Sequence, residues 1–197
     1  EEVASERLGV PVSVGELRLA LLPLPHVTAE DVNIGERKLG SVKRIKVWPA
    51  LLQQRGDEPL RVWTLGCSTG QEAYSIAMSF VEAADKAPRM RKLQVFATDL
   101  NDALLDKARH GLYAKNVAED LSPERLRRFF VEEEGGYRIN KALREMIVFA
   151  RQNVMSDPPF SPLDIISCRN LLIYFKPNLQ KKVFPVFHYA LKPGGYL

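Results

Sequence analysis

Residues 61–75 read Arg-Val-Trp-Thr-Leu-Gly-Cys-Ser-Thr-Gly-Gln-Glu-Ala-Tyr-Ser, and this stretch decides the fold. It opens with a short apolar run that favours β-structure, and the small residues from Gly66 to Gly70 then predict a tight turn. Apolar residues recur at helical spacing from Ala73 to Val81. The stretch therefore predicts a strand, a glycine turn and a helix. Such a turn presents backbone N–H groups at a helix N-terminus, where a ligand can approach closely.

The chemistry of the turn narrows the choice of ligand. A phosphate-binding loop would place a lysine after its last glycine, and none follows Gly70. The glycines are spaced Gly-x-x-x-Gly rather than as in a dinucleotide fold, and Glu72 lies in the first helical turn. A carboxylate there repels a pyrophosphate but suits a cationic amine or sulfonium, and S-adenosylmethionine (SAM) has both. Alternatively, Glu72 only complements the helix dipole, and spacing alone does not separate these interpretations.

The next expected strand favours the SAM interpretation. Residues 93–100 read Leu-Gln-Val-Phe-Ala-Thr-Asp-Leu, an apolar run that ends in an acid. In nucleotide-binding α/β folds, an acid at the tip of the strand after the glycine turn binds the ribose hydroxyls. Asp99 fits that role. It also fits the role of N-cap for a helix that starts near Asn101, and the two roles are compatible.

Four stretches follow one another in this order: residues 66–75 (quoted above), 97–101 (Ala-Thr-Asp-Leu-Asn), 108–113 (Ala-Arg-His-Gly-Leu-Tyr) and 167–175 (Ser-Cys-Arg-Asn-Leu-Leu-Ile-Tyr-Phe). They resemble the CheR-type chemotaxis methyltransferases, most closely the CheB/CheR versions fused into large sensor proteins. The resemblance spans about residues 58–197. It implies an α/β, Rossmann-like SAM-dependent methyltransferase fold with a small inserted α/β subdomain at about residues 121–150, cut short at its C-terminus.

The site residues combine the residue pattern with this resemblance. By resemblance, Asn153 and Val154 contact the adenine end of SAM, although an asparagine there is equally typical of a turn. Arg169 and Asn170 follow the strand expected at residues 163–168, and ligands bind beyond the carboxyl ends of such strands. The resemblance implies that Tyr174 lines the methyl-transfer site, so Tyr174 and Arg169 are the expected catalytic residues. The expected cofactor-binding residues are Gly66, Ser68, Gly70, Glu72, Asp99, Asn153, Val154, Arg169 and Asn170.

The resemblance implies a transferase in chemotactic signal transduction, a SAM-dependent O-methyltransferase that forms glutamate methyl esters on a chemoreceptor or other signalling protein and releases S-adenosylhomocysteine. A glutamate has a pKa near 4.3, so it is already a nucleophilic carboxylate at neutral pH, and the transfer needs alignment rather than a general base. The family's N-terminal helical domain is not seen, and its last strands are cut away after Leu197. An inactive SAM-binding or signalling module is therefore the alternative.

Residues 1–57 differ from the rest of the chain. Alternating apolar and polar residues predict strands at 11–21, 26–34 and 41–48. Parts of this segment resemble the N-terminal start of AsmA-type envelope proteins, which implies the cell envelope, whereas a SAM enzyme belongs in the cytoplasm. We therefore hypothesise that two unrelated pieces join near residues 53–59. On this hypothesis, the chain is an envelope fragment fused to a methyltransferase remnant.

Composition and short motifs argue against other classes. A net charge of +4 with a pI of about 9.1 is too mild to indicate nucleic acid. Residues 157–160 (Asp-Pro-Pro-Phe) resemble the signature of adenine-specific amino methyltransferases, but a strand is expected within a few residues, so the prolines are better explained as shaping a loop.

Cys67 and Cys168 form no Cys-x-x-Cys pair, which indicates reduced core residues and no metal. No apolar run reaches membrane length and there is no signal peptide, so direct membrane insertion is not expected.

Overall fold

The computed structural model describes residues 12–20, 26–34, 41–42, 51–52, 58–85, 87 and 91–197, the first three ranges as backbone only. The chain divides into two compact units, Glu1–Val47 and Trp48–Leu197. This division lies before the boundary expected at residue 58. Leu51 and Leu52 are helical and buried, and the Leu51 carbonyl accepts a hydrogen bond from Arg91.

The first unit is a small antiparallel sheet. Its strands β1 (Val12–Ala20), β2 (His26–Ile34) and β3 (Ser41–Val42) are ordered β1-β2-β3. Alternation of apolar and polar residues is typical of such strands, and the β-rich character expected for this segment is confirmed. Of the strand expected at 41–48, β3 is the described part, and the remainder lies outside the described residues.

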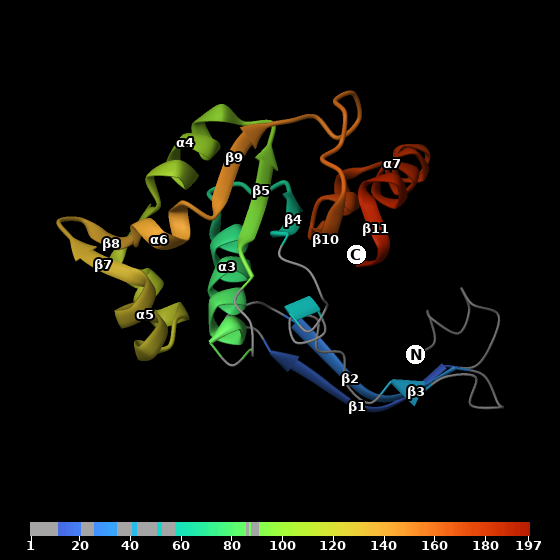
Figure 1. The fold of residues 1–197 in the computed structure, drawn as a ribbon, viewed down its shortest axis with the longest axis horizontal. Coiled ribbons are helices and arrows are strands. Elements are labelled where there is room, and N and C mark those ends of the chain that lie inside the picture. Colours follow the sequence, from blue (N-terminus) through green and yellow to red (C-terminus); the bar gives the residue numbers. More distant parts are fainter. Residues whose placement is uncertain are drawn as a thin grey trace. The chain divides into compact units, whose positions relative to one another are not determined.

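The second unit is built on a five-stranded parallel sheet (Figure 1). Its order is β11-β10-β4-β5-β9, and every neighbouring pair is parallel. The chain therefore starts in the middle of the sheet and winds outward in both directions, so the neighbours β4 and β10 form the switch point at which such folds bind ligands. The Rossmann-like fold is confirmed. The strands are β4 (Leu60–Leu65), β5 (Leu93–Asp99), β9 (Ile147–Arg151), β10 (Leu163–Ser167) and β11 (Leu191–Tyr196).

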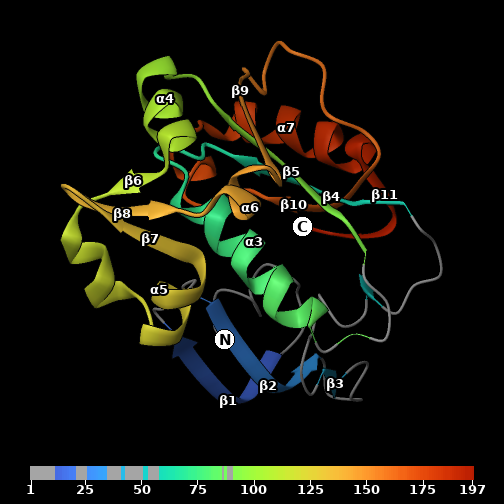
Figure 2. The same cartoon turned by 60° about the vertical axis from the view of Figure 1, so that its left-hand side comes forward.

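Helices cover both faces of this sheet. In Figure 2, α3 (Gln71–Ala84) and α7 (Pro177–Ala190) lie on opposite sides of its strands. Figure 2 also shows α4 (Asp102–His110), which follows β5 and packs against β5 and β9. β11 begins at Leu191, directly after α7, and Leu191 pairs with Leu163 of β10.

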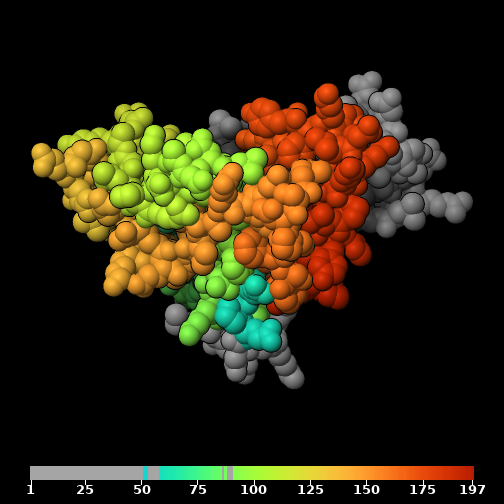
Figure 3. Space-filling model, turned by 90° about the horizontal axis from the view of Figure 1, so that it is seen from above, coloured from blue at the N-terminus to red at the C-terminus, as the bar shows by residue number. Residues whose placement is uncertain are grey.

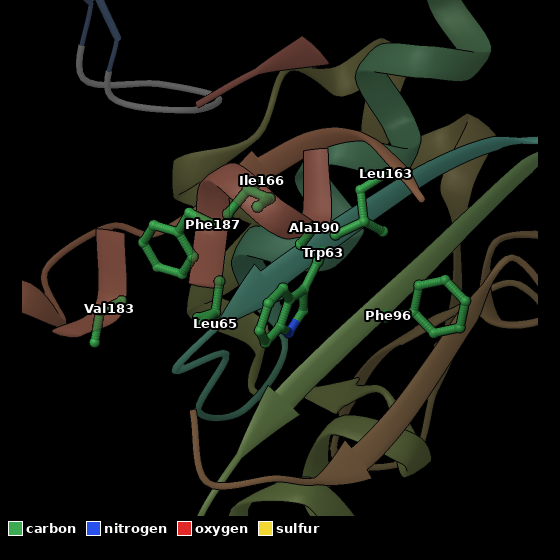
Figure 4. Close-up of a cluster of buried hydrophobic side chains, with 8 residues drawn as sticks. All are labelled: Trp63, Leu65, Phe96, Leu163, Ile166, Val183, Phe187 and Ala190. Atoms are coloured by element: carbon green, nitrogen blue, oxygen red, sulfur yellow. The ribbon is translucent and has the colours of Figure 1, made fainter. Parts of the chain in front are cut away.

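A buried hydrophobic cluster, called the aromatic cluster below, lies between the sheet and α7 (Figure 4). Its members are Trp63, Leu65, Phe96, Leu163, Ile166, Val183, Phe187 and Ala190. Trp63 is fully buried, its ring meets Phe187 edge-on, and its indole N–H donates to Thr98 Oγ1 at 2.9 Å. Phe160 stacks on Phe96 with ring centroids 4.4 Å apart and also meets Trp63 edge-on. Phe160 is thus a packing residue, which supports the interpretation of residues 157–160 as a structural loop.

An insert lies between α4 and β9 and forms its own antiparallel sheet, ordered β6-β8-β7. It starts at residue 112, and its last element is α6, so it differs from the expected range of 121–150. Residues 147–151 pair with β5 because their apolar run suits a parallel strand. In Figure 3 the insert is the yellow part of the surface. Its elements are β6 (Leu112–Tyr113), the 3₁₀ helix η1 (Lys115–Asp120), α5 (Pro123–Phe129), β7 (Phe130–Glu133), β8 (Gly136–Ile139) and α6 (Lys141–Arg144).

Candidate functional site

The turn between β4 and α3 is the first part of the site. Gly66 has φ 63° and Gly70 has φ 89°, values that favour glycine. A Cβ added to Gly70 would lie 2.9 Å from the Ala108 side chain and 3.1 Å from the Phe149 ring. Gly70 therefore lets the turn pack directly on α4 and β9. The turn is also anchored to β5, because the Cys67 N–H donates to the Thr98 carbonyl at 3.0 Å.

Asp99, the last residue of β5, joins this turn to the start of the next helix. Its Oδ2 accepts from the Ser68 N–H at 2.8 Å and its Oδ1 from the Asn101 N–H at 3.0 Å. The N-cap of α4 is Asn101, whose side chain accepts from two backbone N–H groups of the first turn. The alternative in which Asp99 is the N-cap of this helix is therefore wrong. A carboxylate has about four acceptor positions, so two remain for a ligand.

A cleft of about 240 Å³ opens beside Asp99, where β4, β5 and β9 end. Four of the expected site residues line it, namely Gly66, Asp99, Asn153 and Val154. The remaining lining residues were not expected from the sequence. They are Leu65, Thr98, Leu100, Gln152, Met155, Leu171 and Phe175.

A tight turn after β9 forms one wall of the cleft. The Asn153 side-chain oxygen accepts from the Met155 N–H at 3.0 Å, and Asp157 Oδ2 accepts from the Asn153 N–H at 2.8 Å. The hydrogen bonds from the Asn153 N–H and the Ser156 hydroxyl lower the pKa of Asp157. Asn153 thus takes the turn-forming role that was left open as an alternative. Its backbone N–H and side-chain carbonyl are already engaged within this wall.

Glu72 lies in a second cluster, between the first turn of α3 and the end of β10. The Ser167 hydroxyl donates to Glu72 Oε1. Burial raises the pKa of Glu72, and the Ser167 hydrogen bond and the nearby Arg169 charge partly offset this effect. Glu72 is not among the residues that line the cleft. The structure therefore ties it to β10, across the switch point.

Other expected residues are less closely grouped. Asn170 adopts φ 57°, which is uncommon for a residue with a side chain. Tyr174 lies in the short 3₁₀ helix η2 (Leu172–Tyr174) and is 79% exposed. Leu171 and Phe175 line the cleft, but Tyr174 does not. The expected place of Tyr174 at the methyl-transfer site stays a prediction.

Several supporting residues could not be found from local sequence. The Tyr113 hydroxyl donates to the Thr69 carbonyl at 2.7 Å, so β6 of the insert braces the glycine turn. Burial raises the pKa of Tyr113, which keeps this hydroxyl protonated. Tyr113 belongs to the matching stretch 108–113, and Gln152 directly precedes the expected Asn153. Their closeness in sequence to these motif residues was therefore the signal that could have indicated a supporting role for Tyr113 and Gln152.

Both cysteines are free thiols. Burial raises the pKa of Cys67 to about 12 and that of Cys168 to about 11, so neither is a thiolate at neutral pH. Among the described residues there is no cluster of three or more side chains that could hold a metal. Over the same residues, no helix is long and apolar enough to cross a membrane.

The cleft residues fit the nucleoside part of SAM. The Asp99 acceptors suit ribose hydroxyls, and the apolar side chains of Leu100, Leu171 and Phe175 suit the faces of a base. The side-chain oxygen of Gln152 is buried and has no hydrogen-bond partner among the described residues, so an N–H donor from a ligand would satisfy it.

Comparisons with known proteins agree with this chemistry. The chain is 45% identical over 149 residues to an uncharacterized 104.1 kDa protein of Rhodobacter capsulatus, which covers 76% of the chain and 16% of that protein. It is 35% identical over 161 residues to chemotaxis protein methyltransferase 1 of Pseudomonas aeruginosa, covering 79% and 59%. It is 37% identical over 143 residues to the Escherichia coli chemotaxis protein methyltransferase, covering 70% and 49%. The chain thus spans less than two thirds of each relative.

Among solved structures, PKMT2 from Rickettsia typhi in complex with AdoHcy aligns with a TM-score of 0.45 at 15% identity, covering 76% of this chain and 22% of that one. The model of the family described as CheR methyltransferase, SAM binding domain, matches residues 37–197, so the match begins before the boundary expected at residue 58. With most of its length matched, and with the glycine turn, Asp99 and the cleft at the strand ends of its sheet, the chain belongs to the CheR methyltransferase family, in its SAM-binding domain.

Proposed function

We propose that this chain carries the SAM-binding core of a protein-glutamate O-methyltransferase, which forms methyl esters on glutamates of a chemoreceptor or other signalling protein. The observation that carries the proposal is the Asp99 carboxylate, which joins the glycine turn to the start of α4 and lines the cleft. Membership of the CheR family supports the reaction type, and the names of the Pseudomonas and Escherichia relatives support the chemotactic role.

Within this proposal, each part of the cofactor has a partner. Asp99 accepts the ribose hydroxyls, and Asn153 and Val154 flank the adenine. Gly66, Ser68 and Gly70 let the turn approach the ligand closely. Glu72 faces the cationic amine, whose charge would lower the pKa of this buried carboxylate and keep it ionised.

SAM supplies an electrophilic methyl group when it is bound. The acceptor glutamate is ionised at neutral pH, so the chain has only to hold it in line and keep water away. The guanidinium of Arg169, just beyond β10, suits binding of the acceptor carboxylate through paired hydrogen bonds, and Asn170 follows it. The exposed Tyr174 is available to contact the incoming protein segment. Leu171 and Phe175 line the cleft, and their apolar side chains would limit the access of water to it.

The first experiment is calorimetric titration of S-adenosylhomocysteine into the chain, followed by methyl transfer from labelled SAM to a chemoreceptor fragment. Saturable binding that is lost in Asp99→Ala, with ester formation on the fragment, is expected. Binding without transfer would instead support the alternative of an inactive SAM-binding module. A folded sample that does not bind would contradict the proposal.

The proposal places this reaction in the cytoplasm, where SAM is available to a signalling enzyme. The AsmA-type resemblance of residues 1–57 and their separate origin stay predictions. Native packing of residues 1–57 against the glycine turn in an experimental structure would contradict the idea that two unrelated pieces join near residues 53–59.

A further inference from the structure

Gln152 lines the cleft and carries a buried polar atom without a hydrogen-bond partner among the described residues. It is 9% exposed, and its side-chain Nε2 donates to the Pro158 carbonyl at 2.8 Å. A carbonyl only accepts hydrogen bonds, so this contact fixes which end of the amide is nitrogen. The other end, Oε1, is buried and lacks a partner among the described residues. An unpaired buried acceptor destabilises the protein, so a group that satisfies it would gain from binding there.

We propose that Gln152 Oε1 accepts a hydrogen bond from the exocyclic amine of adenine and so determines the base specificity of the cofactor site. This inference rests on the proposed function, because it takes the cleft to hold SAM. Gln152 lines the cleft, and its own backbone N–H donates to the Asp99 carbonyl at 3.1 Å. The acceptor is therefore one strand away from the ribose-binding carboxylate.

The order of the strands explains why the base, rather than the ribose or the amino acid, meets Gln152. Glu72 and Ser167 lie at the switch point between β4 and β10, Asp99 ends β5, and Gln152 follows β9 at the edge of the sheet. A ligand whose amine lies near Glu72 and whose ribose lies at Asp99 extends its base toward β9. The amine of adenine is the hydrogen-bond donor of that base.

The hydrogen bond to Pro158 positions the Gln152 side chain. Its amide holds the Pro158 carbonyl, while Asp157 closes the turn at Asn153. The side chain is thus oriented by the loop in the absence of a ligand, and a preoriented acceptor favours ligands whose donor matches its position. A purely structural role, in which Gln152 only supports the loop, predicts equal losses for all ligands of the cleft, so discrimination between bases separates the two roles.

The test compares two ligands by calorimetric titration into the full chain. One is S-adenosylhomocysteine, and the other is its analogue with purine in place of adenine, in which a hydrogen replaces the amine. We expect the chain to bind the adenine ligand about tenfold more tightly, which corresponds to one buried hydrogen bond. In Gln152→Leu this ratio should fall to about one. In Gln152→Glu, which keeps an acceptor but loses the donor to Pro158, preference for adenine should persist.

The outcomes distinguish this inference from the proposed function. Binding of both ligands with equal affinity by the unmodified chain would overturn the role of Gln152 and leave the proposed function intact. Failure of the folded chain to bind either ligand would overturn both. If Gln152→Leu binds both ligands more weakly by the same factor and keeps the tenfold ratio of affinities, Gln152 has a structural role only and the inference is overturned. The ratio in the unmodified chain does not depend on whether the variants fold.

Discussion

The Asp99 carboxylate accepts a hydrogen bond from the Ser68 N–H at 2.8 Å, across 31 positions of sequence. The same carboxylate accepts from the Asn101 N–H, so one side chain fixes both the glycine turn and the entry to α4. Backbone N–H groups that would otherwise be free are thereby satisfied. In the proposed complex, the ligand-binding carboxylate is thus held in place by the backbone.

Asp99→Ala should therefore lower both ligand affinity and stability. Two hydrogen bonds to a charged group are lost, and we expect the free energy of unfolding to fall by about 2 kcal/mol and S-adenosylhomocysteine affinity to fall at least tenfold. Urea unfolding and calorimetric titration measure the two effects. The matched control is Asp102→Ala, since Asp102 is exposed and makes a long ion pair with Arg151 at 3.7 Å. Unchanged affinity in Asp99→Ala would contradict the assigned role.

Gly70→Ala should lower the free energy of unfolding by more than the backbone strain of an alanine at positive φ accounts for. Both Gly70 and Gly135 have positive φ, but a Cβ at Gly70 would meet Ala108 and Phe149, whereas a Cβ at Gly135 would have nothing within 4 Å. Gly135→Ala is therefore the matched control, with an expected loss of about 1–2 kcal/mol from backbone strain. Overpacking should add about 1–3 kcal/mol in Gly70→Ala. Urea unfolding of the pair measures the difference, and equal losses would show that the packing at Gly70 relaxes freely.

Residues 61–75 and 93–99 allowed the fold to be predicted, because strand, turn and helix each follow from local periodicity. The limits of the insert were not predictable in the same way. Residues 147–151 form an apolar run that suits either a small antiparallel sheet or the central parallel one, and only the pairing of β9 with β5 decides between them. Local pattern does not carry information about partners that are distant in sequence.

The site was predictable in part for the same reason. Gly66, Asp99, Asn153 and Val154 line the cleft because motif positions fall at strand ends. Glu72 was expected beside the ligand, but its bond to Ser167 spans 95 positions and depends on the β4–β10 pairing.

Glu72→Gln should separate stability from function. Burial raises the pKa of Glu72 above its ordinary value of 4.5, so the folded chain binds a proton more readily than the unfolded chain does. Stability therefore falls as the pH rises from 4.5 through the raised pKa of the folded state. The side-chain amide of the variant would keep an acceptor for Ser167 without a charge. We expect the variant to be at least as stable as the parent at about pH 7, to show a weaker dependence of stability on pH above 4.5, and to bind S-adenosylhomocysteine more weakly.

Thermal or urea unfolding at pH 4.5 and at neutral pH, with calorimetric titration at neutral pH, tests this expectation. Ser167→Ala is the complementary control, because it removes the donor and leaves the buried carboxylate without its hydroxyl partner. That variant should be less stable than the parent at neutral pH. Loss of stability at neutral pH in Glu72→Gln would show that the carboxylate stabilises the fold, contrary to the effect of burial on its pKa.

Phe160→Ala should act on stability and not on nucleic-acid binding. Phe160 stacks on Phe96 and meets Trp63, so its removal leaves a cavity beside the aromatic cluster. We expect the free energy of unfolding to fall by about 2–3 kcal/mol, below the range for a fully buried phenylalanine because Phe160 is half-buried. The control is Phe184→Ala. Phe184 lies on α7 and is 48% exposed, so this variant should lose less free energy of unfolding. Tight binding of adenine-containing DNA by the parent chain, abolished in Phe160→Ala, would contradict the packing role.

Tyr174→Phe should affect methyl transfer without affecting cofactor binding. Its side chain is 79% exposed and does not line the cleft, so removal of the hydroxyl leaves the cofactor contacts intact. If the hydroxyl donates to the acceptor carboxylate, its loss should reduce transfer to a chemoreceptor fragment about tenfold, as expected for one hydrogen bond to a charged group. Tyr189→Phe is the matched control, since Tyr189 is 72% exposed on α7. A fall in S-adenosylhomocysteine affinity in Tyr174→Phe would instead place Tyr174 in the cofactor site. Equal transfer rates for the parent and both variants would remove Tyr174 from the catalytic residues and leave Arg169 as the one expected from the sequence.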